Sequence, residues 1–267
     1  MTTDVRERFR QLHAAGLFVM PNPWDVGSAR LLAALGFPAL ATTSSGHAAT
    51  LGRPDQHVRR DELLAHAATL AAAIEVPLNV DAERCFADDP AGVAETVELI
   101  AGTGAAGCSI EDYDPGVGID PVDRAAERVE AAARAASAHG LVLTARAENH
   151  LYGAGDLDDT VARLRAYRAA GADVVYAPGL VALADIARVV RDVDAAVNVL
   201  ARPDGPSTAE LATVGVRRVS TGGALLRAAY STLVRAGREL LDDGTSVYAA
   251  GAMPQTALDA ALRASGT

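Results

Sequence analysis

The sequence predicts a (β/α)8 barrel, the fold also called a TIM barrel, from three repeated features. Eight short apolar segments alternate with longer Ala-, Leu- and Arg-rich stretches of helical period. Several of these stretches open with a capping motif, and glycine closes five of them shortly before the next apolar segment. Eight such units fill about 220 residues, close to the ~250 residues that a barrel of this kind needs.

The eight apolar segments are expected to be parallel strands. Runs such as 174–176 are apolar at every position, which is typical of strands buried on both faces. The predicted strands are 17–21, 39–43, 77–81, 107–111, 141–146, 173–177, 196–201 and 217–221.

The helical stretches between them carry start and stop signals. Asp89-Pro90 and Asp120-Pro121 each place an acid as N-cap before a first-turn proline, and Ser207–Glu210 reads as a capping box. The glycines that close helices are Gly36, Gly104, Gly140, Gly171 and Gly215. A doubly wound sheet is the rival fold, but it would show a glycine-rich loop after its first strand, where this chain has Asn22–Gly27.

Nothing between the units resembles a linker, so residues 1–267 are predicted to form one domain. Residues 245–267 follow the eighth unit and are expected to add one amphipathic helix, packed on its own barrel or on a neighbouring subunit.

Composition narrows the classes of protein to consider. The chain has 267 residues, and 24 Lys and Arg against 34 Asp and Glu give a net charge of −10, which argues against nucleic acid or an anionic membrane as partner. No segment reaches ~18 consecutive apolar residues, and the N-terminus lacks a signal-peptide pattern. With only two cysteines, a cytoplasmic location is expected.

Carboxylates follow three neighbouring strands at their carboxyl ends, where barrel enzymes place their active sites. Asp81, Glu83 and Glu111 form an oxygen-only cluster, with Asp112 or Glu148 nearby, and such ligands suit Mg2+, for which Mn2+ is expected to substitute. The alternative is that these acids cap helices or form salt bridges with Arg84 and Arg146.

Two further strand ends carry candidate substrate-binding groups. Arg146 is expected to grip a substrate carboxylate with its planar fork. Ser44-Ser45-Gly46-His47 offers small side chains and N–H groups for an oxyanion, although His47 alone reads equally as a capping or surface residue. Four other histidines, His13, His57, His66 and His139, are expected at the surface.

Taken in order, the strand-end motifs resemble the isocitrate lyase/phosphoenolpyruvate mutase family over residues 17–227. These motifs are Asn22–Ala29, Thr43–Gly46, Asp81–Glu83, Ser109–Asp112 and Ala145–Glu148. The resemblance implies C–C or C–P bond chemistry beside a 2-oxo acid, through a pyruvate enolate. It also implies a homo-oligomer, a dimer or tetramer whose C-terminal helices are exchanged between subunits.

The resemblance assigns roles to individual residues of this chain. It implies Mg2+ held by Asp81, Glu83 and Glu111, with Ser45, Gly46 and His47 around the substrate carboxylate and C2 oxygen. Catalysis would rest on these three residues and on Arg146, and the substrate pocket would add Trp24, Asp25 and Glu148.

One motif of the family is missing. The lyases carry Lys-Lys/Arg-Cys-Gly-His after the fourth strand and the phosphomutases carry Lys and Asn there, whereas residues 113–120 contain no Cys, Lys, Asn or His. Removing the proton from a substrate hydroxyl needs a general base, but losing CO2 from a 2-oxo diacid does not. The sequence therefore favours a decarboxylase of oxaloacetate type acting on a small dicarboxylate.

Four alternatives remain open at this stage. One is a lyase of a substituted malate or isocitrate, with His47, Tyr113 or Tyr152 as base, and another is C–P bond chemistry. A third is a non-catalytic protein that binds a 2-oxo acid. Cys85, two residues after Glu83, could also serve as the proton donor, against the simpler reading of a buried apolar side chain.

Overall fold

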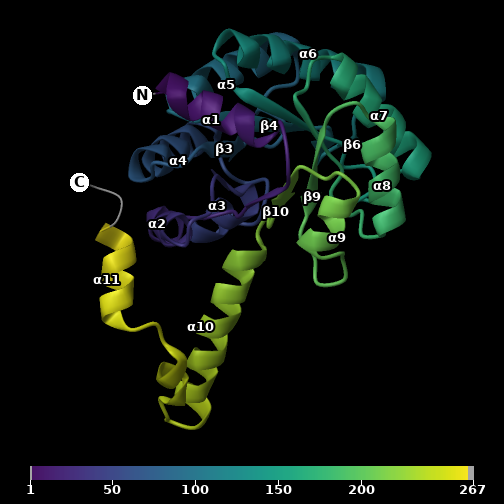
Figure 1. Ribbon diagram of the computed structural model, residues 1–267. Helices are drawn as coiled ribbons and strands as arrows, with labels where there is room; N and C mark the ends of the chain where they lie inside the picture. Colours follow the sequence, from purple (N-terminus) through teal and green to yellow (C-terminus); the bar gives the residue numbers. More distant parts are fainter. Residues whose placement is uncertain (1, 264–267) are drawn as a thin grey trace.

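The computed structural model describes residues 2–263 and forms a nearly closed (β/α)8 barrel, as predicted (Figure 1). Eight parallel strands lie in the order β1-β10-β9-β8-β7-β4-β3-β2. Their bounds are β1 Phe18–Met20, β2 Leu40–Ala41, β3 Leu78–Asp81, β4 Gly107–Glu111, β7 Val142–Arg146, β8 Val174–Tyr176, β9 Ala196–Leu200 and β10 Arg218–Ser220. Each lies within its predicted segment.

The helices cover the outside of the barrel. Those between the strands are α2 Val26–Ala34, α3 Ser44–Thr50, α4 Arg60–Ala73, α5 Pro90–Gly102, α6 Val122–Ala138, α7 Leu157–Ala169, α8 Leu183–Asp192 and α9 Thr208–Thr213. The main core lies between strands and helices and contains outward-facing strand residues such as Val80, Leu143 and Val219. None of the helices within residues 2–263 is long and apolar enough to cross a membrane.

The two ends of the sheet meet between β1 and β2. The N–H of Ala41 donates to the carbonyl of Pro21 at 3.1 Å, and the Asn22 amide donates to the carbonyl of Thr42 at 2.7 Å. The barrel is therefore closed here by a backbone bond and a side-chain bond instead of a regular ladder.

Most of the predicted helix boundaries are confirmed. The five closing glycines all have positive φ, Asp89 caps α5, and Ser207 and Glu210 form the capping box of α9. The prediction for Asp120 is wrong, because Pro121 is the N-cap of α6 and has no side-chain cap. Asp120 is instead buried, 2.8 Å from Arg128 and 3.3 Å from Arg84.

An N-terminal helix that the sequence did not predict, α1 (Thr2–Leu12), closes the amino end of the barrel. Phe9 is fully buried in this contact. The Arg6 guanidinium donates to the carbonyls of Ala101, Ala105 and His139, so one side chain satisfies the ends of two helices.

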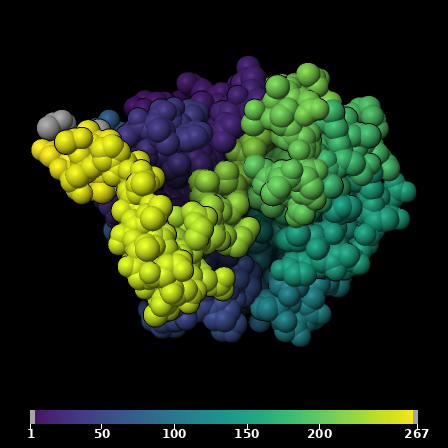
Figure 2. Space-filling model, turned by 90° about the horizontal axis from the view of Figure 1, so that it is seen from below, coloured from purple at the N-terminus to yellow at the C-terminus, as the bar shows by residue number. Residues whose placement is uncertain are grey.

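The C-terminal extension is longer than predicted. Helix α10 (Ala224–Asp242) projects from the carboxyl end of the barrel, and the 3-10 turn η1 (Val247–Gly251) and α11 (Gln255–Arg263) return along it (Figure 1). Seen from below, this arm projects toward the viewer in front of the barrel (Figure 2). Arg30 of α2 donates to the Leu262 carbonyl at 2.9 Å, which anchors α11. The last part of the predicted tail helix, residues 264–267, lies outside the described residues.

Candidate active site

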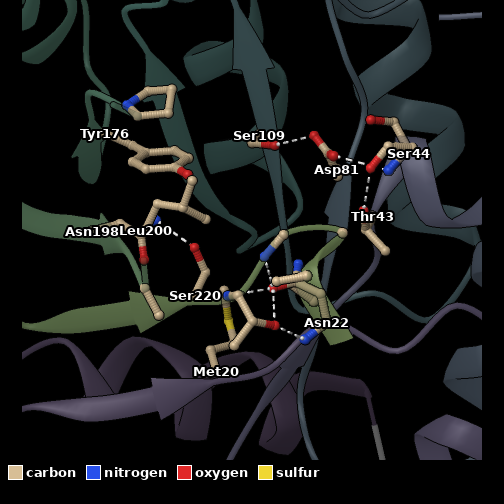
Figure 3. Close-up of a pocket in the computed structure, with 18 of the residues that line it drawn as sticks. Met20, Asn22, Thr43, Ser44, Asp81, Ser109, Tyr176, Asn198, Leu200 and Ser220 are labelled. Atoms are coloured by element: carbon tan, nitrogen blue, oxygen red, sulfur yellow. Dashed lines mark hydrogen bonds between the residues drawn. The ribbon is translucent and has the colours of Figure 1, made fainter. Parts of the chain in front are cut away.

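A cavity of about 630 Å³ opens at the carboxyl ends of the strands and is lined by residues of all eight (Figure 3). Asp81 and Ser109 stand on one side of it, and Asn198 and Ser220 on the other. Active sites of (β/α)8 enzymes occupy this position, so the cavity is the candidate active site.

Arg146 holds three carboxylates beside this cavity. Its Nη1 lies 2.7 Å from Asp81 Oδ1, its Nη2 lies 3.0 Å from Glu111 Oε2, and its Nε lies 2.8 Å from Glu148 Oε1. The salt-bridge alternative is thus present for Arg146. Arg84 is not part of this cluster, because it pairs with Asp88, Asp114 and Asp120.

Two loops complete the environment of these acids. Asp81 Oδ2 accepts the backbone N–H of Ser44 at 3.0 Å, which ties β3 to the start of α3. Glu111 Oε1 accepts from the Gln56 amide at 2.9 Å, and the neighbouring Asp55 lines the cavity. Sequence reasoning missed Asp55 and Gln56 because their segment reads as an ordinary polar connection.

Glu83 is buried, and its carboxylate forms no hydrogen bond or ion pair within the described residues. Its Oε1 has no hydrogen-bond partner within the described part of the chain, and its φ is +49°. Burial, with a smaller contribution from Asp81, raises the pKa of Glu83 to about 8. Cys85, Phe86 and Gln56 also have positive φ, and non-glycine residues in this region gather at functional sites.

The donor set fits a divalent cation. Asp81, Glu111 and Glu148 share the single guanidinium of Arg146, and Glu83 Oε1 has no hydrogen-bond partner within the described residues. Hard oxygen ligands with excess negative charge are what Mg2+ prefers. Within residues 2–263 no three acidic, His or Cys side chains stand close enough to be a preformed ligand set. Cation binding therefore requires Arg146 or the acids to shift.

Only one residue of the predicted Ser45-Gly46-His47 cradle lines the cavity. Ser45 does so, next to Ser44. The N–H groups of Gly46 and His47 are already bonded to Thr43, the N-cap of α3. The His47 ring points away from the cavity and stacks on His66 at 3.8 Å between centroids.

The remaining predicted pocket residues lie behind the cavity wall. Asp25 is the N-cap of α2, and its Oδ1 accepts the N–H of Ser28 at 2.7 Å. Trp24 backs onto Gly46, where an added Cβ would lie 3.3 Å from the Trp24 Cβ. Glu148 reaches the site only through Arg146.

Two histidines expected at the surface are partly buried. His13 lies under the barrel against Phe9, and His66 lies under His47. Burial and the neighbouring His47 lower the pKa of His66 to about 4. In the unfolded chain His66 takes up a proton near its ordinary pKa of 6.5, whereas in the folded chain it does so only near pH 4. The neutral, buried His66 ring therefore contributes stability that is lost as the pH falls from about 6.5 to about 4.

We expect His66→Phe, which keeps the stacked ring, to reduce this pH dependence. The wild-type free energy of unfolding should fall between pH 7 and pH 5 by roughly 1–2 kcal/mol more than that of the variant. Urea unfolding at the two pH values measures this. An identical pH dependence in both proteins would contradict the assignment.

Residues 113–120, which follow β4 and lack the family's catalytic motif, form a small hairpin of β5 (Tyr113–Asp114) and β6 (Gly118–Ile119). Asp114 pairs with Arg84 at 3.0 Å, and the Tyr113 ring stacks on Tyr152 at 3.8 Å. The hairpin is thus attached to both neighbouring loops.

Cys85 is fully buried in the main core and does not line the cavity. Burial raises the pKa of its thiol to about 12, which is the opposite of what a proton-transferring cysteine needs. Cys85→Ala should therefore keep turnover within about twofold, far from the ~10²-fold loss expected for a missing proton donor. Steady-state rates of the two proteins measure this, and a loss of that size would restore the catalytic reading.

The deeper cavity wall was not predicted. Asn79, Asn198, Arg218 and Ser220 face the barrel interior, although their segments were read as simple apolar strands. A polar residue at every second position of a strand, as in Arg218-Val219-Ser220, is the signal that could have found them.

Comparisons with known proteins place the chain in a family. The profile described as phosphoenolpyruvate phosphomutase matches residues 9–241. An uncharacterized protein of Mycobacterium tuberculosis is 35% identical over 88% of this chain and 89% of its own. An oxaloacetate decarboxylase of Paraburkholderia xenovorans is 33% identical over 66% of this chain and 62% of its own.

A solved structure from Burkholderia cenocepacia, assigned only by class as a lyase or mutase, is 48% identical. It covers 98% of this chain and 97% of its own, with a TM-score of 0.94. The match to the profile and these relatives agree with the order of the strand-end motifs and with the barrel. The chain belongs to the isocitrate lyase/phosphoenolpyruvate mutase family of enzymes, whose members are lyases and mutases and generally depend on a metal ion.

Proposed function

We propose that this protein is a Mg2+-dependent decarboxylase of a small 2-oxo dicarboxylate, of oxaloacetate type. The observation that carries the proposal is the tethered hairpin after β4, which offers no Cys, Lys, Asn or His to act as base. Loss of CO2 needs no base at the bond-breaking step, so the remaining groups suffice. The similarity to a protein named oxaloacetate decarboxylase is in line with this.

Each group of the site has a definite task in this reaction. Asp81, Glu83 and Glu111 would hold the cation, which when bound would stabilise the negative charge that develops on the 2-oxo oxygen as CO2 leaves. Ser44 and Ser45 present hydroxyl groups to the cavity for a substrate carboxylate. The C–C bond breaks, CO2 leaves with the former carboxylate carbon, and water in the open cavity returns a proton to the enolate carbon.

Arg146 would take part in both substrate binding and metal binding. Its fork is occupied by three acids, so it can turn to a substrate carboxylate once a cation has taken over part of their charge. In this proposal Arg146 binds the substrate carboxylate, and Glu148 holds Arg146 in place. Gly46 and His47 would contribute the shape of the α3 turn, and Trp24 and Asp25 its support.

The test is a ¹H NMR assay with oxaloacetate and with 2-alkylmalates. Because oxaloacetate loses CO2 slowly by itself and faster with Mg2+, every rate is compared with Mg2+ alone and with Mg2+ plus Asp81→Asn. Pyruvate formed only by the wild-type protein supports the proposal. Cleavage of a 2-alkylmalate into a 2-oxo acid that keeps the alkyl group and a second acid identifies the lyase alternative instead. Binding of oxalate without turnover of either substrate identifies a non-catalytic binding protein.

We also propose that the chain forms one folding unit that assembles through its C-terminal arm into a dimer or tetramer. Large apolar side chains on this arm are exposed, among them Leu233 at 67%, Leu241 at 86% and Val247 at 71%. Apolar surface of this extent is typical of a subunit contact. Light scattering of the wild type and of Leu233→Asp tests this assembly, because the variant should shift to a smaller species.

We also propose a cytoplasmic location for this protein. Its two cysteines, Cys85 and Cys108, are free thiols, which suit a reducing compartment.

A further inference from the structure

A buried cation without a carboxylate partner lies at the floor of the cavity. Arg218 is only 2% exposed, and its donors reach neutral acceptors alone. Nε donates to Asn198 Oδ1 at 3.0 Å, Nη2 donates to Thr144 Oγ1 at 2.8 Å, and Nη1 lies 3.3 Å from His13 Nε2. No acidic side chain within the described residues forms an ion pair with it.

The surroundings of Arg218 cannot supply the missing negative charge. The Phe9 carbonyl lies 2.8 Å from Nδ1 of His13, so His13 donates there and accepts from Arg218 through Nε2. Burial and the charge of Arg218 lower the pKa of His13 to about 3, which keeps it neutral. Burial also lowers the pKa of Arg218 itself to about 9, as expected for a guanidinium removed from water. A buried charge of this kind is normally paired.

The floor also offers donors and space. A guanidinium has five N–H groups, of which the three contacts above use three, and Arg218 lines the cavity. Asn79 lines it as well: its Oδ1 is buried without a partner, and its Nδ2 makes no hydrogen bond within residues 2–263, which leaves the amide N–H groups to donate. Thr144 lies two residues before Arg146 on β7, so the floor is one layer of side chains below the carboxylate cluster.

We propose that Arg218 and Asn79 form a subsite for a small monovalent anionic group at the floor of the barrel. The group is either a free inorganic anion such as a halide or one carboxylate of a bound organic acid, since both present the same charge to the guanidinium. The other cavity arginines are poorer candidates. Arg146 is surrounded by three acids, Arg202 pairs with Asp204, and Arg227 is exposed. The subsite does not depend on the proposed decarboxylase activity.

Bromide is the probe, because it can be located by its anomalous scattering. Crystals of the metal-free wild-type protein soaked in bromide should show a peak within hydrogen-bond distance of Arg218. The midpoint temperature of thermal unfolding should rise with added bromide, because bromide binds the folded state. The dissociation constant for bromide should be about tenfold higher or more in Arg218→Met, because the variant loses a charge-assisted hydrogen bond to the anion.

Two further variants make the result specific. Arg217→Met is the matched control, because Arg217 immediately precedes Arg218 and donates to the Gly16 carbonyl outside the cavity. It should respond to bromide like the wild type. Asn79→Leu removes a donor and fills the floor while leaving every bond of Arg218 in place, so it should weaken bromide binding even where Arg218→Met fails to fold.

The possible outcomes distinguish a substrate carboxylate from a free anion, and both of these from the absence of an anion subsite. Competition between bromide and oxaloacetate or oxalate assigns the subsite to a substrate carboxylate, whereas simultaneous binding assigns it to a free anion. Water alone at Arg218 in the soaked crystals, with the same bromide response in Asn79→Leu, Arg217→Met and the wild type, would overturn the proposal. None of these measurements uses turnover, so they stand whether or not decarboxylation is found.

Discussion

Asp81→Asn is expected to lower turnover by about 10³-fold or more, because it weakens cation binding and removes a charge-stabilising group at the reacting centre. Asp81 is the acid that contacts Arg146, Ser109 and the N–H of Ser44 at once, so no neighbour can take its place. The rate of pyruvate release measures the loss. The thermal shift given by Mg2+ with oxalate should disappear as well, which reports on binding without turnover.

The matched control is Asp61→Asn, which changes an exposed acid at the start of α4 and should leave both measurements unchanged. Mn2+ should restore the activity of an EDTA-treated wild-type protein, because it accepts the same oxygen ligands. Full activity of the wild type in EDTA would contradict the metal assignment for Asp81, Glu83 and Glu111.

Arg146→Met is expected to produce the second large effect, on stability as well as on activity. It leaves the buried carboxylates of Glu111 and Glu148, and the partly buried one of Asp81, without a cation, and breaking a buried ion pair costs about 3–5 kcal/mol. Urea unfolding without metal should show this loss. Mg2+ should recover part of it, since it can neutralise the same acids.

Arg146→Lys separates the charge of this residue from its shape. A lysine keeps the charge but cannot reach three carboxylates at once, so turnover should stay far below that of the wild type. Arg124→Lys on α6, whose ion pairs are 3.8 Å long and partly exposed, is the control and should have little effect. Wild-type activity in Arg146→Lys would show that the fork is not used on the substrate.

Mg2+ rescue of Arg146→Met also tests the charge argument for the metal. If Asp81, Glu83 and Glu111 form the cation site, the variant should bind Mg2+ at least as tightly as the wild type, because the competing positive charge on Asp81 and Glu111 has gone. Calorimetric titration with Mg2+ measures this directly. Weaker binding in the variant would indicate that Arg146 positions the acids more than it competes for them.

Much of the fold could be predicted from the sequence because its signals are local. Continuous apolar runs predicted the strands, and the caps of α5 and α9 depend on residues within one turn of each other. The carboxylate cluster was equally accessible, because all parallel strands end at the same edge and bring Asp81 and Glu111 together.

Asp120 shows where local reasoning fails. Its position before Pro121 predicts a helix cap, but a buried guanidinium from Arg128 supplies a stronger partner for its carboxylate. Likewise, α1 has a largely polar sequence, and only the barrel end that it covers explains why Phe9 is buried and His13 packs against it.

The sequence by itself determined that this chain is a barrel with acids at the ends of its strands, since both properties follow from residue order. Only the tertiary structure decided which way individual side chains face. In a barrel both faces of a strand are buried, so hydrophobicity does not distinguish Arg218, inside, from Arg217, outside. In α3 each residue turns by about 100°, which directs Ser45 into the cavity and His47 onto His66.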